Sequence, residues 1–409
     1  MMQRRDMLKL ILAGATAFAT PFSFVSRAYA YATHGASDTR FLLVFLRGGY
    51  DAVNVVIPVS SSFYYESRPT LAIKKPNAND PESALGLSHG GKAVEWGLHP
   101  ALKDTIYPLW QQKQVAFIPF AGTNNLSRSH FEVQDSVEEG LPNESHSMRS
   151  SGFLNRLSGV LGNAAAPVAF TDGLPVSMTG DLLIPNVSLK GTGPAPLVDR
   201  QMALLADMYA GTRFESLVNE GFKLRKDIAE QDTMMRSENR NAISARGFEL
   251  EARRMAGLMR DKFNLGFIDV GGWDTHVNQG GVQGQLANQL GNLGGGLAVF
   301  ARQMGSAWKN TVVVVISEFG RTFRENGTRG TDHGHGTVYW ILGGAVHGGR
   351  IAGEQVSIER KSLNQDRDWP VLTEYRALLG GMFQRMYGLD ATQLGRIFPG
   401  ATPRDLDLV

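Results

Sequence analysis

Short, almost uninterrupted apolar runs constrain the fold of this 409-residue chain more than any other feature. They lie at residues 41–46, 115–120, 167–171, 265–270, 312–317 and 338–343. Runs that lack alternating polar residues predict strands buried on both faces. Helical patterns precede two of them, at residues 99–114 and 284–305. This alternation predicts an α/β fold with a mostly parallel sheet that helices cover on both faces.

Residues from about 198 to 262 differ from the rest, because they are charged, amphipathic and free of strand-like runs. We predict a helical insertion in the α/β domain. Basic and acidic residues alternate in it, which favours a solvated helix face over a binding surface.

The first thirty residues have the pattern of an export signal. Arg4 and Arg5 precede a short apolar core, and Ala28-Tyr29-Ala30 forms a small-x-small cleavage site. The order resembles a twin-arginine signal, which implies the twin-arginine translocase as a partner during export. The alternative, a membrane anchor, is disfavoured by the short apolar core. We expect a periplasmic or secreted protein of residues 31–409, without a stable membrane anchor after processing near Tyr31.

Charge and cysteine content narrow the functional classes. Removing residues 1–30 takes four Lys/Arg and one Asp from totals of 41 and 39, and leaves 37 basic and 38 acidic side chains. Such a chain has no excess positive charge for nucleic acid. Cysteine is absent, so stability outside the cytoplasm depends on the hydrophobic core. The sequence does not indicate an oligomeric state.

Polar residues lie at or shortly after the ends of three of the predicted strands. They are Arg47 and Asp51 after the first, Asp269, Asp274 and His276 after the fourth, and Glu318 and Arg321 after the fifth. In an open α/β sheet, ligands bind outside the carboxyl ends of the strands. We therefore predict that Asp51, Glu318 and the Asp274/His276 pair converge in space.

The loop between the last two strands carries the most specific pattern, Asp332-His333-Gly334-His335. Carboxylate and imidazole groups in one short loop suit Zn²⁺, Mn²⁺ or Fe, and the glycines allow the backbone to bend around an ion. A solvated polar loop is the alternative.

Other residues at the strand ends have simpler interpretations. Asp51 alone also fits a helix N-cap. Asp269 fits a core carboxylate or a partner of a metal ligand. His99 and His347 lack a neighbouring carboxylate in the sequence, and we expect both to be structural.

Several motifs together resemble the DUF1501 family. They are the export signal, "LLVFLRGGYDAVNVVIP", "GLHPAL", "RSHFEVQD", "DVGGWDTH" and "ISEFGRTFRENGTRGTDHGHGTVYWILGGAVHGGRI". That family is related to the alkaline phosphatase and sulfatase superfamily. The resemblance implies an alkaline phosphatase-like three-layer α/β/α sandwich with one or two divalent metals, zinc first and manganese, magnesium or calcium as alternatives.

The resemblance also implies roles for particular residues. Asp51 matches the first metal carboxylate of the superfamily, and Asp274 and His276 match its central Asp/His pair. The usual Asp-His-Gly after the late strand is missing, because Glu318 and Phe319 stand there. Glu318 then takes the Asp role, and His333 or His335 takes the role of the last histidine.

The superfamily uses a Ser, Thr or formylglycine nucleophile, and the lack of cysteine excludes a Cys-derived formylglycine. Ser127 and Ser129 beside His130 are the candidates, at an expected helix start where amide N–H groups bind an oxyanion. Plain helix capping is the alternative. Arg47 or Arg321 is expected to clamp the remaining oxygens.

Two functional hypotheses follow. The first is an exported metal-dependent hydrolase of a small-molecule or polymer phosphate or sulfate ester. The second is a non-catalytic protein of the same fold that binds a metal or an extracellular polymer. A nucleotide-dependent dehydrogenase is disfavoured, because the glycine pattern at 191–196 is not followed by a helix start.

Overall fold

The computed structural model describes residues 38–88, 95–142, 151–189, 199–212, 215, 218–219 and 247–409. The expected export signal at residues 1–30 and the middle of the predicted helical insertion lie outside these residues. Two helices are described within the predicted insertion, α6 (Asp199–Tyr209) and α8 (Phe248–Asp261). Among the described residues, no helix combines the length and the apolar character needed to cross a membrane.

The large sheet has eight strands in the described part of the chain. They are β1 (Arg40–Leu46), β5 (Val115–Gly122), β6 (Pro167–Ala169), β7 (Leu265–Val270), β8 (Thr311–Ser317), β9 (Thr337–Leu342), β10 (Arg350–Ile351) and β11 (Thr373–Glu374). Their order is β10-β5-β9-β8-β1-β7-β6, and β11 also pairs with β5. The apolar runs of the sequence therefore form the centre of one sheet, as predicted.

All pairings in this sheet are parallel except those of β9. Leu43 in β1 lies opposite Phe267 in β7 and Val314 in β8. Because β9 is antiparallel to both β8 and β5, the strands β1, β5, β7 and β8 all point the same way. The loop from β8 to β9 thus leaves and returns at the edge where these four strands end.

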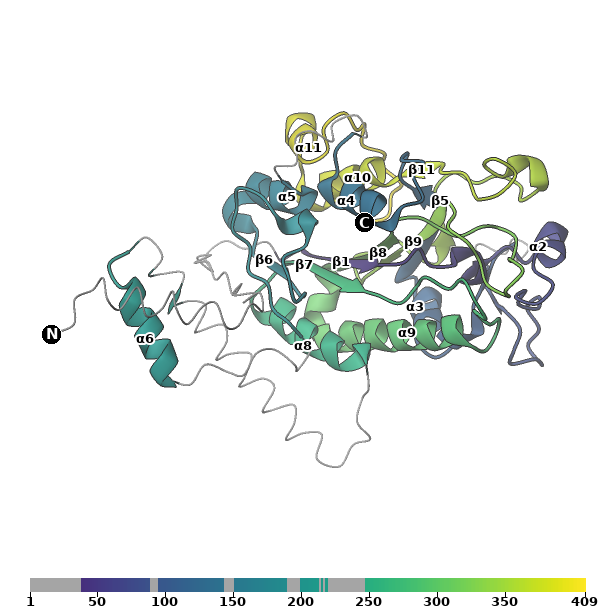
Figure 1. Cartoon of the computed structure of the whole chain (residues 1–409), viewed down its shortest axis with the longest axis horizontal. Helices are drawn as coiled ribbons and strands as arrows, with labels where there is room; N and C mark the ends of the chain where they lie inside the picture. Colours follow the sequence, from purple (N-terminus) through teal and green to yellow (C-terminus); the bar gives the residue numbers. More distant parts are fainter. Residues whose placement is uncertain are drawn as a thin grey trace, which may run out of the picture.

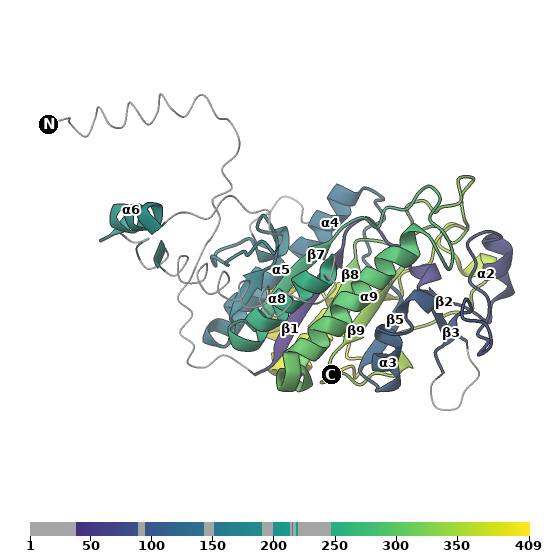
Figure 2. The same ribbon diagram turned by 90° about the horizontal axis from the view of Figure 1, so that it is seen from below.

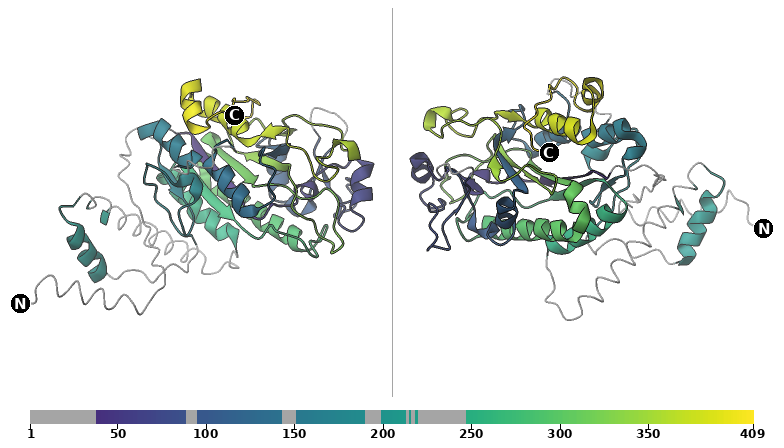
Figure 3. Two further views of the ribbon diagram at one scale, coloured as in Figure 1. Left: turned by 45° about the horizontal axis from the view of Figure 1, so that its top comes forward. Right: turned by 180° about the vertical axis from the view of Figure 1, so that it is seen from behind.

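Helices cover both faces of the sheet. The helices of the described residues are α2 (Ser62–Ser67), α3 (Ile106–Gln111), α4 (His130–Glu139), α5 (Phe153–Leu161), α9 (Gln285–Met304), α10 (Tyr375–Tyr387) and α11 (Ala391–Ile397), besides α6 and α8. Figure 1 shows α4, α5, α10 and α11 above the sheet and α3, α8 and α9 below it. Figure 2 shows α8 and α9 lying over the strands and running along them, and Figure 3 shows the same layers from two other directions.

Alternating residues of β1 explain the three layers. Leu42, Val44 and Leu46 belong to one apolar cluster, together with residues of α3, α8 and α9. Phe41, Leu43 and Phe45 belong to a second cluster, together with residues of α4, α5, α10 and α11. A strand that buries both faces needs apolar residues at every position, which is the pattern of the sequence. The predicted three-layer α/β/α class with a mostly parallel sheet is confirmed.

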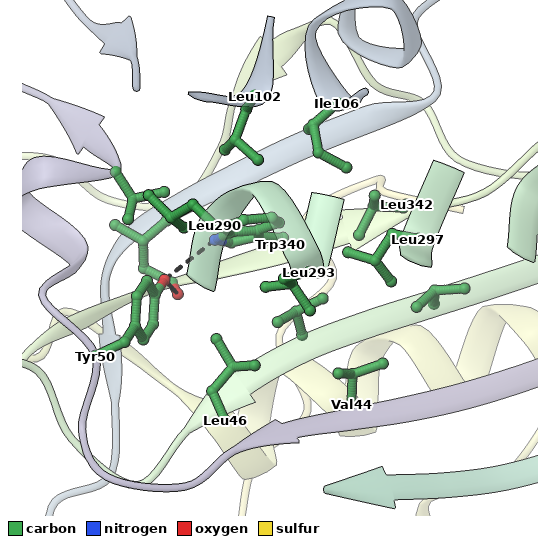
Figure 4. Packing of buried hydrophobic residues seen from close by; sticks show 14 of the residues in the cluster. Val44, Leu46, Tyr50, Leu102, Ile106, Leu290, Leu293, Leu297, Trp340 and Leu342 are labelled. Carbon is green, nitrogen blue, oxygen red and sulfur yellow. Dashed lines mark hydrogen bonds between the residues drawn. The ribbon is translucent and has the colours of Figure 1, made fainter. Parts of the chain in front are cut away.

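A buried aromatic pair fixes the segment after β1. Trp340 in β9 donates its Nε1–H to the hydroxyl of Tyr50 at 3.1 Å, and that hydroxyl donates to the carbonyl of Val338. Figure 4 shows both rings among Leu46, Leu290 and other apolar side chains. Burial of such a ring contributes about 1.5–3 kcal/mol, provided its polar atom has a partner.

A smaller antiparallel sheet has the order β2-β4-β3 and consists of β2 (Val56–Ile57), β4 (Gly97–Leu98) and β3 (Leu85–Gly86). His99 follows β4 and is fully buried. Its Nδ1 accepts from the N–H of Ala101 at 3.0 Å, and its Nε2 lies 3.0 Å from the carbonyl of Gly281. Both ring nitrogens have backbone partners, so His99 is structural, and burial lowers its pKa.

Candidate metal centre

Three imidazole rings meet at the edge where the parallel strands end. The Nε2 atom of His333 lies 2.9 Å from Nε2 of His130 and 3.0 Å from Nε2 of His276. The Oδ1 atom of Asp274 lies 3.2 Å from Nε2 of His333. The same Oδ1 lies 2.9 Å from Nε2 of His276 and 3.7 Å from Nε2 of His130. Nε2 of His333 and Oδ1 of Asp274 therefore each lie close to the other three potential ligand atoms.

The other nitrogen of each ring has an acceptor behind it. Nδ1 of His130 lies 2.8 Å from Oε1 of Glu318, and Nδ1 of His276 lies 3.1 Å from Oδ1 of Asp332. Nδ1 of His333 lies 2.9 Å from the carbonyl oxygen of Arg128. Because these acceptors carry no proton, each Nδ1 is the N–H, and the lone pair of each Nε2 points into the group.

This arrangement suits a divalent cation. Nitrogen lone pairs that face one another at about 3 Å repel unless a cation or a proton lies between them. Metal-binding histidines usually donate their other N–H to a carboxylate or a backbone carbonyl, as all three do here. In the described part of the chain, His130, Asp274 and His333 offer ligand atoms that all lie within 4.8 Å of one another. Three imidazoles and a carboxylate match the ligands that Zn²⁺ takes in proteins.

Three different segments contribute to the group, called the histidine centre below. His130 is the first residue of α4, which follows β5. Asp274 and His276 follow β7, and His333 lies in the loop from β8 to β9. Each segment leaves the same edge of the sheet, where the parallel strands end.

Two glycines let the β8–β9 loop approach its neighbours. A Cβ atom on Gly334 would lie 2.5 Å from the backbone of Arg321, and one on Gly330 would lie 2.2 Å from the carbonyl oxygen of His276. Any larger residue would push the loop away. Gly334 also donates its N–H to the carbonyl of Gly320 at 2.8 Å, which holds His333 over the strand end.

Arg321 adds a positive charge beside the centre. Its side chain is fully buried, and Nη2 donates to Oδ1 of Asp274 at 2.7 Å. Burial alone would raise the pKa of the Asp274 carboxyl, but Arg321 and the neighbouring histidines hold that pKa below its usual value. Asp274 is therefore an anion in the folded protein at neutral pH. The structure thus brings Arg321 to the centre, where it contacts Asp274; its clamping of ester oxygens stays a prediction.

Glu318 lies behind a ligand histidine. It is fully buried, and its Oε1 accepts from the N–H of Gly48, from Nδ1 of His130 and from Nε2 of Gln134, each at 2.8 Å. Ser317 donates to Oε2 at 2.9 Å. Burial would raise the pKa of this carboxyl, but the hydrogen bonds from His130 and Gln134 keep it below the usual value. The structure thus places Glu318 as a partner of His130, where the sequence predicted a direct ligand.

We expect Glu318→Gln to weaken binding of a divalent metal by about 10–100-fold, as loss of such partners usually does. The amide would carry no charge to hold the N–H of His130, and its own N–H groups would face those of Gly48 and Gln134. Metal affinity measured by competition with a chelator checks this. Asp366→Asn is the control, because that carboxylate is engaged by Arg324 and Arg360. Unchanged affinity in Glu318→Gln would contradict the assigned role.

Asp332 also lies behind a histidine. Its Oδ1 accepts from Nδ1 of His276 and from Nδ2 of Asn326 at 3.0 Å. Burial would raise the pKa of Asp332, but Asn326 and His276 lower it. The side chain is half exposed, so it orients His276 from the solvent side, where the sequence predicted another direct ligand.

Asp51 is not part of the histidine centre. It is fully buried, and its two carboxylate oxygens accept from Nη1 and Nη2 of Arg68 at 2.6 and 2.9 Å. Nε2 of Gln279 donates to Oδ2 at 2.6 Å. With both oxygens occupied by these donors, the carboxylate serves a buried ion pair, which differs from the predicted ligand role.

Arg47 also lies outside the group of ligand atoms. It pairs with Asp269 at 2.7 Å and with Glu138 at 2.7 Å, and Nη1 donates to Oε1 of Gln134 at 2.9 Å. Gln134 in turn donates to Glu318, so Arg47 contacts the centre only through two other side chains. Arg47 and Asp269 line a cavity of about 410 Å³.

The two candidate serines differ in their contacts. The hydroxyl of Ser127 donates to Oε2 of Glu132 at 2.8 Å and accepts from the N–H of Ser129 at 3.3 Å. That pattern is typical of a local turn. Ser129 is exposed at the N-cap position of α4, next to His130, and its side chain does not cap the helix.

His335 is buried next to the centre without joining its ligand atoms. Burial, with a smaller contribution from the charge of Arg128, lowers its pKa to about 4. His347 lies at the surface, where Nδ1 is 3.5 Å from a carboxylate oxygen of Asp407. Of the two histidines left open for the last ligand, the structure thus brings only His333 to the centre.

The low pKa of His335 predicts acid sensitivity. An unfolded histidine has a pKa of about 6.5, so the unfolded chain gains a proton first as the pH falls. The free energy of unfolding should therefore fall by about 2–3 kcal/mol between about pH 6.5 and pH 4 because of this residue. Urea unfolding in EDTA at several pH values checks it: His335→Gln should lose this slope and His347→Gln should keep it. Equal slopes in the wild type and His335→Gln would contradict the prediction.

Sequence reasoning missed some residues of the site. His130 was expected to act with a nucleophile, whereas its Nε2 lies among the ligand atoms. The backbone of Arg128 and the side chain of Gln134 had no expected role. The position of His130 at the start of a helix after a strand was the one signal for it, because β5 ends at the same edge as β1, β7 and β8.

The fold and the site define a three-layer α/β protein with a histidine–carboxylate centre at the carboxyl edge of its parallel strands. The chain belongs to the DUF1501 family, whose sequence model, described as "Protein of unknown function (DUF1501)", matches residues 38–398. The resemblance seen in the motifs is thereby confirmed. No curated protein matches the chain.

Several solved structures are similar to the chain. One is a protein in the alkaline phosphatase superfamily from Vibrio parahaemolyticus, at 12% identity and a TM-score of 0.35, covering 100% of this chain and 81% of that one. Another is the phosphonate monoester hydrolase of Agrobacterium radiobacter, at 9% identity and a TM-score of 0.33, covering 85% and 73%. A third is the lipoteichoic acid synthase LtaP from Listeria monocytogenes, at 9% and 0.31, covering 94% and 80%. At such low scores the similarity supplies no argument about activity.

Proposed function

We propose that this chain is a metal-dependent hydrolase of phosphate or sulfate esters, with the cation held by His130, His276, His333 and Asp274. One observation carries the proposal: Nε2 of His333 and Oδ1 of Asp274 lie next to each other and to Nε2 of His130 and His276, and each imidazole is held from behind by an acceptor. Zinc is the proposed metal, because nitrogen-rich sets with one carboxylate suit it, and magnesium and calcium prefer oxygen ligands.

A divalent cation at this place supplies Lewis acidity toward an ester oxygen. The chain's own residues bind and orient. The guanidinium of Arg321 attracts the anionic group of the ester. Because the Arg321 side chain is fully buried, it is held in one position and shielded from water. Glu318 holds the N–H of His130, and Asp332 holds that of His276, so the rings keep one orientation.

An anionic ester follows from the charges at the centre. Among the described residues, Asp274 is the one carboxylate with an oxygen among the ligand atoms, and its charge is matched by Arg321. A dication would then leave a net positive site, which attracts phosphate or sulfate groups. The site is also open, because the Asp274 side chain is 45% exposed, so an ester can reach it.

The nucleophile separates two routes. Ser127 already donates to Glu132, which leaves Ser129 as the serine for a covalent route.

A second candidate function, metal binding without catalysis, is favoured by one observation. In the described residues, no serine or threonine hydroxyl is seen to hydrogen-bond to the four proposed ligand atoms. Export by the twin-arginine translocase, proposed from residues 1–30, would place either function outside the cytoplasm.

The test uses the full-length protein as exported by its cell. Its metal content is measured, the metal is removed with EDTA, and zinc, manganese, magnesium or calcium is restored separately. Hydrolysis of p-nitrophenyl phosphate and p-nitrophenyl sulfate is followed for each form, with Ser129→Ala and Ser127→Ala alongside. Hydrolysis that disappears with the metal and returns with zinc supports the proposal. Stoichiometric metal without hydrolysis of either ester would favour the non-catalytic function, and absence of bound metal would refute both.

A further inference from the structure

Three large apolar side chains stand exposed in the segments that carry the histidine centre. Phe131 is 85% exposed, Leu126 is 62% exposed and Val277 is 56% exposed. Phe131 directly follows His130, and Val277 directly follows His276. We call Leu126, Phe131 and Val277 the apolar rim.

Two rim residues are direct chain neighbours of rings that converge at the centre. The Nε2 atoms of His130 and His276 both lie within 3.0 Å of Nε2 of His333. Consecutive Cα atoms are only about 3.8 Å apart, so Phe131 and Val277 start one residue from two of the converging rings. Leu126 precedes Arg128 by two residues, and the carbonyl of Arg128 holds His333.

Core packing does not account for the rim. The helix α4 buries Val133 and Val137 against the sheet, and these residues belong to the core cluster beneath it. Phe131 belongs to neither core cluster. Single exposed apolar residues are ordinary, but large ones beside two proposed ligand histidines and the loop that holds the third point to a binding surface.

We propose that the apolar rim binds the apolar part of an amphiphilic ester, whose phosphate or sulfate group lies at the histidine centre. This inference rests on the proposed function and names its substrate class as monomeric alkyl or aryl esters. Charge complementarity identifies the occupant: the buried guanidinium of Arg321 and a cation attract an anionic head, while the rim offers only apolar contact to what is attached to it. A long sulfated polymer would need further positive charge along its length, and the chain without residues 1–30 has no excess of it.

Binding can be tested without turnover by using methylphosphonate and octylphosphonate, whose P–C bond is not an ester. Dissociation constants are measured by calorimetry on the full-length, zinc-loaded protein, with octylphosphonate below its micellar concentration. Each methylene that the rim covers should tighten binding about fourfold, which is about 0.8 kcal/mol. We expect octylphosphonate to bind at least about tenfold more tightly than methylphosphonate.

Phe131→Ser should reduce that octyl-to-methyl preference by about tenfold, and Phe131→Leu should restore most of it. Leu183→Ser is the matched control, since Leu183 is 38% exposed and its neighbour Leu182 contacts Asn155 of α5 instead of the centre. This control should keep the wild-type preference.

Other outcomes would overturn the inference. Equal affinities for the two phosphonates, or an equal preference in Phe131→Ser, would show that the rim does not bind the chain. A rim-dependent attachment to phosphatidylcholine vesicles without preference for the monomeric octyl ligand would assign the rim to a membrane surface. Rim-dependent self-association in light scattering, again without that preference, would assign it to a second copy. A clear octyl preference in a protein that hydrolyses no ester would support the rim and refute the hydrolase proposal.

Discussion

His333→Ala should lose stoichiometric divalent metal. His333 has the most central position in the group, because its Nε2 lies within 3.2 Å of Nε2 of His130, Nε2 of His276 and Oδ1 of Asp274. Removal of this ring takes away one of four ligands and leaves the loop without the atom that reaches the others. We expect zinc affinity to fall by more than the 10–100-fold typical for residues behind a ligand. Metal analysis after dialysis against a weak chelator measures this.

Two histidines of the same chain provide controls for this variant. His335→Ala should keep its metal, because His335 is buried beside the centre and its ring is not among the gathered ligand atoms. His347→Ala should also keep it, since that ring contacts Asp407 at the surface. Circular dichroism would show that all three variants are folded. Full metal content in folded His333→Ala would refute the centre as a metal site.

The fold could be predicted from the sequence because its strongest signals are local. Each of the six apolar runs became a strand of one sheet, with bounds shifted by at most a few residues. The direction of β9 was not predictable in this way, because an apolar run looks the same in a parallel and an antiparallel strand. The β8–β9 loop decides it: the chain turns back on itself, and Gly334 bonds to Gly320 across the turn.

The region of the site was predictable, but the roles within it were not. Asp274 and Glu318, far apart in sequence, both contact His130, at 3.7 and 2.8 Å. Whether a carboxylate binds a metal or holds a histidine depends on differences of a few ångströms that spacing in the sequence does not encode. For that reason Glu318 and Asp332 each contact the Nδ1 side of a histidine ring, whereas Asp274 lies among the ligand atoms.

Asp51 shows the limit most clearly. It follows β1 as a metal carboxylate of the superfamily would, but its partner Arg68 stands 17 residues later, at the end of α2. Nothing in the local pattern links the two. The ion pair is an outcome of how α2 packs against the strand ends, and it appears only once the chain is folded.

Arg68→Ala should destabilise the protein by about 3–5 kcal/mol, because it leaves the carboxylate of Asp51 buried without its partner. The guanidinium is fully buried, and besides Asp51 it donates to Oδ1 of Asn54 and to the carbonyls of Phe323 and Thr322 at 2.7–3.0 Å. Its loss would therefore also leave two buried carbonyls of the β8–β9 loop, which carries His333, unsatisfied. Urea unfolding at pH 7 measures the free energy. Arg360→Ala is the control, since that side chain is 76% exposed in its pair with Asp366 and should change stability by less than about 1 kcal/mol.

The same pair distinguishes the structural role of Asp51 from a ligand role. Asp51→Asn should lower stability, because a neutral amide no longer balances the buried charge of Arg68, and it should leave the zinc content of the folded protein unchanged. A direct ligand would behave in the opposite way: zinc content would fall, and added zinc would stabilise the wild type far more than the variant. Unfolding curves with and without zinc, together with metal analysis, separate the two. Loss of zinc from folded Asp51→Asn would return Asp51 to the metal site and remove the buried pair as the reason for its position.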